Sequence, residues 1–227
     1  GISSLNLGFG GESGGGAYHS LYDTYDHYKR FSDGDFTYGV TLAKVNSRLV
    51  LRLSESEILP YRFINMADNI KTFIDSNKKL AKKVKEETVR RNNLLDKKAF
   101  TIAKNPKIQY APPKRLSEMK DFDFSSLDRS YNKLVDAAIS FEKAIERSKI
   151  DNISQTDLIE INRLIREVEG ALTMEKGLPR RPWYKNMIYA PGFYTGYGVK
   201  TLPGIREGLE QRNWNEVDTY IQEVAKA

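Results

Sequence analysis

Two histidines and the absence of cysteine limit the chemistry that this sequence can perform. His19 and His27 are the only imidazoles, so a neutral-pH base or an imidazole metal ligand must be one of these two residues. Without cysteine the chain has no thiolate ligand for zinc, no cysteine nucleophile and no disulfide. The His-Glu-x-x-His zinc motif is also absent. The residue types therefore disfavour an enzyme that is complete within this chain.

A run of basic residues is the second candidate for chemistry. It lies toward the end of a long helix predicted from Pro60, where cations favour the helix dipole. One interpretation is a phosphate-binding stripe, and the other is an ordinary solvated face. No aromatic residue is interleaved for base stacking, and Glu86 and Glu87 dilute the charge, so we expect no nucleic-acid partner. The basic residues are Lys78, Lys79, Lys82, Lys83, Lys85, Arg90 and Arg91.

The overall composition is that of a soluble globular protein. The chain has 227 residues, of which 40% are hydrophobic and 29% are charged, with a net charge of +6. Its mean hydropathy is −0.56. No stretch approaches the roughly 20 apolar residues that span a bilayer, so no membrane span is expected. The glycine-rich segment Gly10–Gly16 lacks the Gly-Lys-Ser/Thr ending of a phosphate-binding loop.

The first part of the chain must position the histidines. Ile2–Phe9 alternates loosely and predicts one buried strand, which is followed by the glycine-rich loop. Ser20 with Asp23 predicts the start of a short helix. Residues 36–54 fit both strand and helix spacing, and we favour a helix because the pattern is longer than a typical strand.

The remainder predicts a helical bundle. Apolar residues at helical spacing follow Pro60, and further helices are expected after a polar connector at residues 92–122. Residues 177–200 are rich in proline, glycine and aromatic residues, which is typical of an ordered loop. Such a loop either carries function or only covers helix ends with its aromatic side chains. The fold class is therefore mainly α, with a strand and a glycine-rich loop at the front. The later helices are expected to begin near Ser125, Ser154, Pro203 and Trp214.

Three blocks of sequence resemble one known family. Residues 18–25, Tyr-His-Ser-Leu-Tyr-Asp-Thr-Tyr, closely resemble the segment with the last zinc ligand in glutamate carboxypeptidase-type metallopeptidases. This family, the N-acetylated-α-linked acidic dipeptidases, is related to the transferrin receptor. Residues 177–191 resemble a loop of its C-terminal helical domain, and residues 202–205, Leu-Pro-Gly-Ile, resemble the start of the next helix. The blocks occur in the same order, and the resemblance is weakest at about residues 85–122.

This resemblance implies a zinc exopeptidase acting on peptides. His19 would be a ligand to one of two zinc ions, which together polarise the scissile carbonyl. Tyr18 would donate its phenol to the developing oxyanion. The alternative is that these two residues cap a turn. The family's other zinc ligands and its glutamate general base come from segments upstream, so we expect this chain alone to be inactive.

The resemblance also implies a domain organisation. Residues 1–58 would be the C-terminal edge of an α/β zinc-peptidase domain. Residues 59–227 would be the transferrin receptor-like dimerisation domain, which pairs with a second copy of itself. The implied partners are the upstream catalytic domain of the same protein, a twin subunit and a peptide substrate. The implied location is outside the cytoplasm, either periplasmic or secreted.

The sequence departs from the family at the substrate-binding loop. Glutamate-specific members use a lysine followed by a tyrosine to bind the substrate carboxylate, whereas this chain has Gly196 followed by Tyr197. Lys200 is nearby and is a candidate substitute in a different register. Strict glutamate specificity is therefore not expected. A non-catalytic helical module related to the transferrin receptor is the alternative function, although the transferrin receptor lacks the histidine that this chain has at position 19.

Overall fold

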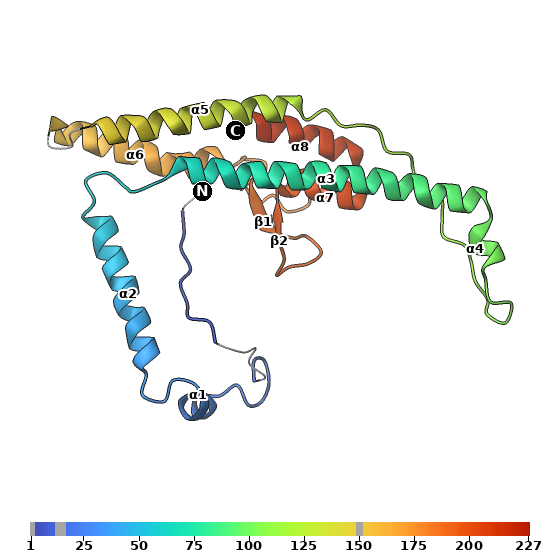
Figure 1. Cartoon of the computed structure of the whole chain (residues 1–227), viewed down its shortest axis with the longest axis horizontal. Coiled ribbons are helices and arrows are strands. Elements are labelled where there is room, and N and C mark those ends of the chain that lie inside the picture. Colours follow the sequence, from blue (N-terminus) through green and yellow to red (C-terminus); the bar gives the residue numbers. More distant parts are fainter. Residues whose placement is uncertain (1–2, 12–16, 149–151) are drawn as a thin grey trace. The chain divides into compact units, whose positions relative to one another are not determined.

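The structure is a computed structural model that describes residues 3–11, 17–148 and 152–227. These residues contain eight helices and a two-stranded sheet (Figure 1). They divide into two compact units. Unit 1 comprises residues 62–148 and 167–227, and unit 2 comprises residues 3–61 and 152–166. The predicted mainly helical fold is confirmed.

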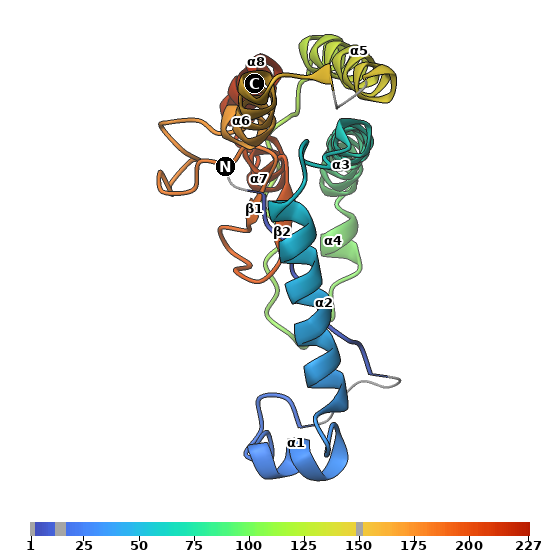
Figure 2. The same ribbon diagram turned by 90° about the vertical axis from the view of Figure 1, so that its left-hand side faces the viewer.

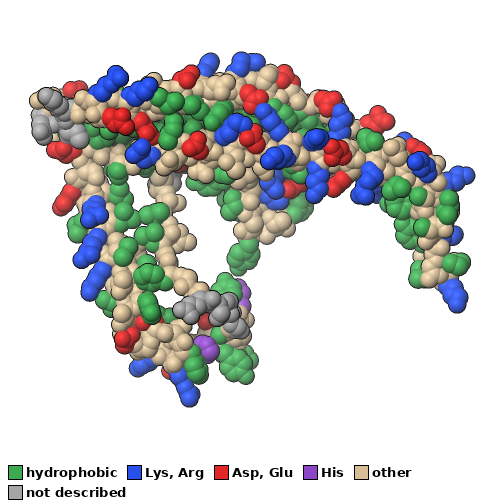
Figure 3. All heavy atoms as spheres, viewed as in Figure 1, with side chains coloured by type: hydrophobic (Ala, Val, Ile, Leu, Met, Phe, Trp, Pro, Cys, Tyr) green, Lys and Arg blue, Asp and Glu red, His purple; other side chains and the backbone are tan. Residues whose placement is uncertain are grey.

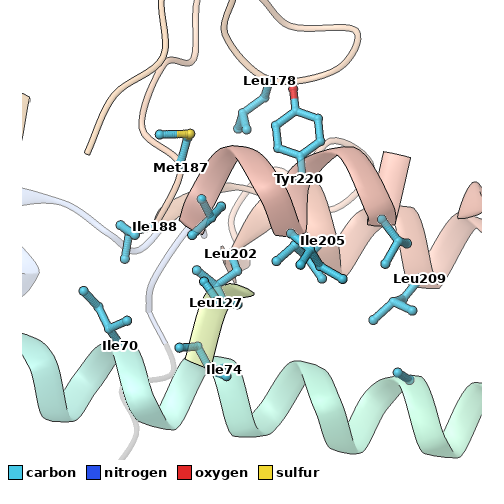
Figure 4. Close-up of a cluster of buried hydrophobic side chains, with 14 of the residues drawn as sticks. Ile70, Ile74, Leu127, Leu178, Met187, Ile188, Leu202, Ile205, Leu209 and Tyr220 are labelled. Carbon is cyan, nitrogen blue, oxygen red and sulfur yellow. The ribbon is translucent and has the colours of Figure 1, made fainter. Parts of the chain in front are cut away.

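Unit 1 is a helical bundle with one hydrophobic core. Its helices are α3 (Phe63–Asp96), α4 (Ala99–Ile102), α5 (Ser125–Arg147), α7 (Pro203–Gln211) and α8 (Trp214–Lys226). The packed pairs are α3 with α5, α3 with α7, α5 with α8, and α7 with α8 (Figure 2). Figure 4 shows Ile70 and Ile74 of α3 pointing toward the layer that contains Leu127, Leu202 and Ile205. Each fully buried aliphatic side chain of this kind stabilises the fold by about 1.5–3 kcal/mol.

Polar contacts fix the relative positions of these helices. Lys78 of α3 donates to both carboxylate oxygens of Asp128 on α5, at 2.6 and 2.7 Å. The fully buried amide of Asn77 donates to the carbonyl of Thr201, which ties α3 to the sheet. Gly204 allows α7 to lie directly on α8, because a Cβ there would come within 2.1 Å of the Tyr220 ring. The bundle is thus held by apolar packing together with specific side-chain contacts.

A small hairpin interrupts the loop that the sequence predicted between residues 177 and 200. Strand β1 (Tyr189–Pro191) pairs antiparallel with β2 (Val199–Thr201), with Ala190 opposite Lys200. The strands are three residues long, which is too short for an alternating pattern to be recognised. The ordered loop was therefore predicted, whereas its hairpin was not.

Unit 2 contains α1 (Tyr25–Phe31), α2 (Thr37–Ser54) and the first part of α6 (Gln155–Ala171). The preference for a helix at residues 36–54 is confirmed. The short helix begins at Tyr25 rather than after Ser20, because the Thr24 side chain caps it. The buried carboxylate of Asp33 accepts two N–H groups of the first turn of α2, from Tyr38 and Gly39.

The predicted strand at Ile2–Phe9 is wrong in its described part. Residues 3–9 form no regular secondary structure, and Ile2 lies outside the described residues. A strand must pair with a neighbour to satisfy its backbone groups, and in the described part of the chain the two strands of the sheet pair only with each other. Residues 12–16 of the glycine-rich segment also lie outside the described residues.

Helix boundaries elsewhere follow the sequence closely. Ser154 caps α6 by accepting from the backbone of Asp157, as the sequence predicted. The predicted connector at residues 92–122 starts later than expected, since α3 continues to Asp96 and the short α4 follows. The predicted domain boundary after residue 58 was based on resemblance to a family, whereas the two units are defined by contacts within the chain. The boundary therefore stays a prediction.

Candidate functional site

Tyr18 and His19 lie on a tight turn in unit 2. The backbone of His19 has a φ of 59°, a left-handed conformation that is uncommon for a residue with a side chain. The rings of Tyr18 and His19 stack, with centroids 3.9 Å apart. Both side chains are exposed, Tyr18 at 72%. The turn therefore presents a phenol and an imidazole together on the surface of unit 2.

Other residues maintain this turn. The Asp23 carboxylate accepts the backbone N–H of His19 at 3.3 Å. The Ser20 hydroxyl donates to the carbonyl of Ala17 and accepts the N–H of Tyr22. Within the described residues, no hydrogen bond involves the imidazole of His19 or the hydroxyl of Tyr18. The capping contacts thus come from the neighbouring residues, and both functional groups remain available.

Within the described residues, the side chains around His19 do not form a metal site by themselves. In the described segments, no three histidine, aspartate or glutamate side chains are close enough to hold a metal ion. A catalytic zinc ion normally requires three protein ligands. The second histidine, His27, lies partly exposed on α1 with its ring 4.9 Å from that of Phe31. The donor set of the described residues therefore does not fit a zinc ion without further ligands.

Tyr197 and Lys200 lie on the hairpin of unit 1. Tyr197 is 92% exposed and follows Gly196, whose φ of 61° favours glycine. Lys200 is in a different environment. Its amine donates to both carboxylate oxygens of Glu210 at 2.9 Å, and Arg206 contacts the same carboxylate. The Tyr197 side chain is therefore free to contact a ligand, whereas Lys200 already has a partner.

A buried ion pair holds the loop on which Tyr197 lies. Arg181 and Glu207 are 2.8 Å apart, and their side chains are 3% and 4% exposed. The second oxygen of Glu207 accepts the backbone N–H of Phe193 at 2.8 Å. The Arg181 guanidinium also lies over the rings of Phe193 and Tyr184. Glu207 thus joins two distant parts of the loop to α7.

The start of the loop is anchored by Tyr220 of α8. Its hydroxyl donates to the carbonyl of Gly177 at 3.0 Å. Burial raises the pKa of Tyr220 to about 12, and the nearby Glu216 and Glu223 contribute to the increase. The phenol therefore stays protonated and continues to donate at any ordinary pH.

Sequence reasoning did not identify Glu207 or Tyr220 as residues that support the loop. Glu207 gave one usable signal, because it lies in the short helix between Ile205 and Leu209, both of which are buried. A charge on the buried side of a helix normally has a partner.

Tyr18 and His19 belong to unit 2, and Tyr197 and Lys200 belong to unit 1, so the structure describes each pair within its own unit.

Comparisons with known proteins match part of the chain to a domain family and all of it to curated relatives. Residues 122–227 match the transferrin receptor-like dimerisation domain family. The whole chain is also 28% identical to the probable glutamate carboxypeptidase LAMP1 of Arabidopsis thaliana and 26% identical to a probable glutamate carboxypeptidase of Arthroderma benhamiae. It spans 28% and 27% of the length of these two relatives. The resemblance seen in the sequence is thereby confirmed: residues 122–227 match a transferrin receptor-like dimerisation domain, and the whole chain is similar to probable glutamate carboxypeptidases.

Among the residues that the structure describes, every helix is too short or too polar to cross a lipid bilayer.

Proposed function

We propose that this chain is the part of a zinc-dependent exopeptidase that carries the dimerisation bundle and one side of the active site. The observation that supports this proposal most strongly is the similarity to probable glutamate carboxypeptidases over all of the chain. The exposed Tyr18–His19 pair agrees with it, because neither the imidazole nor the phenol forms a hydrogen bond among the described residues.

Each residue of the pair has a role in this proposal. His19 contributes one imidazole ligand to a dinuclear zinc site, and Tyr18 donates a hydrogen bond to the oxyanion that forms on the scissile carbonyl. The remaining ligands and the general base come from another segment of polypeptide. Since the described residues lack a complete donor set, this chain alone is expected to be inactive.

Unit 2 supports the proposal that a further domain packs against it. Neither α1 nor α2 has any buried residue. Many apolar side chains of unit 2 are exposed, including Leu21 before α1 at 94% and Val50 of α2 at 63%. Residues 1–58 are accordingly proposed to be the edge of a catalytic domain, and residues 59–227 the dimerisation domain. A catalytic domain would cover these exposed apolar side chains.

The substrate is proposed to be a peptide that contacts Tyr197. In the structure, Lys200 can reach a substrate carboxylate only if it leaves Glu210. Since Gly196 supplies no cation, recognition of a glutamate side chain is not expected to dominate. The relatives' names refer to glutamate carboxypeptidases, so this chain would differ from a strict glutamate-specific enzyme at this position.

The two histidines provide the test and its control. The chain, expressed together with whatever polypeptide precedes it in its gene, is assayed for zinc content and for hydrolysis of N-acetylated dipeptides. His19→Ala is expected to lose zinc and nearly all activity, while His27→Ala retains both. Full zinc content and full activity in His19→Ala would reject the peptidase role and favour a non-catalytic helical module. Zinc-dependent turnover by the chain alone would contradict its expected inactivity.

The dimerisation bundle is proposed to pair with a second copy of this chain. The match of residues 122–227 to a dimerisation domain supports this proposal. Sedimentation at concentrations about ten times a micromolar dissociation constant is expected to show a dimer. A strictly monomeric profile would contradict the homodimer without affecting the proposed role of His19.

A further inference from the structure

Residues 97–113 form a projection from the bundle, which we call the arm. Two contacts define where it starts and ends. The guanidinium of Arg91 donates to the carbonyl of Lys114, and Asn92 exchanges two hydrogen bonds with the backbone of Leu116. These contacts hold the returning chain against α3. The intervening arm, which includes α4, extends beyond them at the far end of α3 (Figure 1).

The positive charge of the chain is concentrated around the arm. Residues 90–120 contain nine lysines and arginines but only two carboxylates, a net charge of +7, whereas the whole chain has a net charge of +6. The arm has no acidic residue and four basic residues: Lys97, Lys98, Lys104 and Lys107. All four are exposed, and within the described residues none of them forms an ion pair.

The arm also exposes apolar side chains among these lysines. Ile102 is 79% exposed, Ile108 is 62% exposed and Tyr110 is 46% exposed. Hydrophobic and basic side chains occupy this end of the molecule in Figure 3. Isoleucines exposed to this degree contribute little to the core. Their combination with unpaired lysines matches a surface that offers both negative charge and an apolar layer.

We propose that the arm binds the surface of an anionic lipid bilayer. Lysines attract acidic headgroups, and each basic residue near such a surface strengthens binding about fivefold. Isoleucine and tyrosine insert at the boundary between headgroups and acyl chains. Stable attachment requires two signals, one electrostatic and one apolar, and the arm supplies both. The arm lies outside residues 122–227, so the match to the dimerisation family does not account for it.

A membrane surface fits the arm better than a nucleic acid does. A nucleic acid attracts the lysines equally well, but it has no apolar layer for Ile102 and Ile108. Sequence-tolerant binding of single strands usually relies on several stacked aromatic residues, whereas Tyr110 and the partly buried Phe100 are the arm's aromatic residues. The apolar side chains therefore distinguish the two partners.

Vesicle sedimentation with the whole chain tests the charge component. Vesicles contain phosphatidylcholine alone or with about 30 mol% phosphatidylserine. The chain is expected to bind the acidic vesicles much more strongly, and Lys104→Gln with Lys107→Gln is expected to lower the partition coefficient about 30-fold. The matched control neutralises Lys133 and Lys143, two exposed lysines of α5, and should have a much smaller effect. Equal binding to both kinds of vesicle would overturn the proposal.

The apolar component requires a second variant. Ile102→Asn with Ile108→Asn leaves all charges in place and is expected to lower vesicle binding at least about tenfold. Because both side chains are exposed, circular dichroism should show that the fold is unchanged. Unaltered vesicle binding in this variant would overturn the lipid assignment. Stronger binding to duplex DNA than to acidic vesicles, with no effect of the isoleucines, would assign the arm to nucleic acid instead.

Discussion

The loop of residues 177–201 and the arm of residues 97–113 have similar compositions but different environments. Each contains four basic residues and no acidic residue. In the loop, every cation pairs with a glutamate outside the loop. In the arm, no cation has a carboxylate partner within the described residues. The loop pairs are Arg180–Glu216, Arg181–Glu207, Lys185–Glu175 and Lys200–Glu210.

This difference shows that the location of acidic residues decides what a cation does. Helices α7 and α8 supply three of the four glutamates of the loop, so its cations hold the loop on the bundle. The arm extends past α3 and has no such partners among the residues that the structure describes. Charges that are satisfied within the chain stabilise its fold, and charges that are not satisfied remain available for an external partner.

The largest effect on stability is expected from breaking the buried ion pair between Arg181 and Glu207. Glu207→Ala leaves the Arg181 guanidinium buried without its counter-ion and removes the acceptor of the Phe193 N–H. The loss should be about 3–5 kcal/mol in the free energy of unfolding. Urea denaturation followed by tryptophan fluorescence measures it.

A double variant separates the charge from the packing. Arg181→Met with Glu207→Leu removes both charges together, so it should recover most of the lost stability. If the double variant is as unstable as Glu207→Ala, the cost comes from the lost acceptor of the Phe193 N–H or from the shape of the site rather than from the unpaired charge. The comparison between loop and arm would then be weaker than proposed.

A smaller effect on stability is expected from ionising Tyr220, which anchors the start of the loop. The pKa of Tyr220 is raised from 10 to about 12 in the folded chain, because burial favours its neutral form. The stabilisation that follows from this raised pKa is complete below pH 10. It is lost as the pH rises through 12, and the free energy of unfolding then falls by about 2–3 kcal/mol. Tyr220→Phe should remove this part of the decline in denaturation curves measured at several alkaline pH values. Tyr197→Phe, which changes an exposed tyrosine of the same loop, should retain it.

The sequence predicted the helices well, because their apolar spacing records the core directly. Ile70 and Ile74 recur at helical spacing and are buried as that pattern requires. The sequence predicted less well where structure depends on partners that are distant in the chain. The strand predicted at Ile2–Phe9 had alternation but no neighbour, and the observed hairpin pairs Tyr189 with Thr201 over only three residues. The local sequence pattern shows neither whether a strand has a neighbour nor whether so short a pairing forms.

The candidate site shows the same division. The motif around His19 could be recognised, since its neighbours in sequence are also its neighbours in the turn. Glu207 could not be assigned to Arg181, because the two residues are 26 positions apart and only the packing of α7 brings them together. The engagement of Lys200 with Glu210 was hidden for the same reason. Residues proposed to contact a ligand could thus be named from local sequence, whereas the residues that support them could not.

A modest effect is expected at the hairpin itself. Lys200→Met removes a partly exposed ion pair, but Arg206 still contacts Glu210. The free energy of unfolding should fall by about 0.2–1 kcal/mol. Urea denaturation at low and high salt checks this value, because the wild-type chain should approach the variant as salt screens the pair. A loss as large as that of Glu207→Ala would place Lys200 with the buried pair rather than with surface ion pairs.

The smallest effect is expected in the arm, and it is the converse of the first prediction. Lys104→Gln with Lys107→Gln removes two charges that have no partner within the described residues. The free energy of unfolding should therefore change by less than about 0.5 kcal/mol, even though the same variant is expected to weaken vesicle binding strongly. Measuring stability and vesicle binding on one preparation makes the comparison direct. A large loss of stability would show that these lysines support the fold, and the distinction between the loop and the arm would fail.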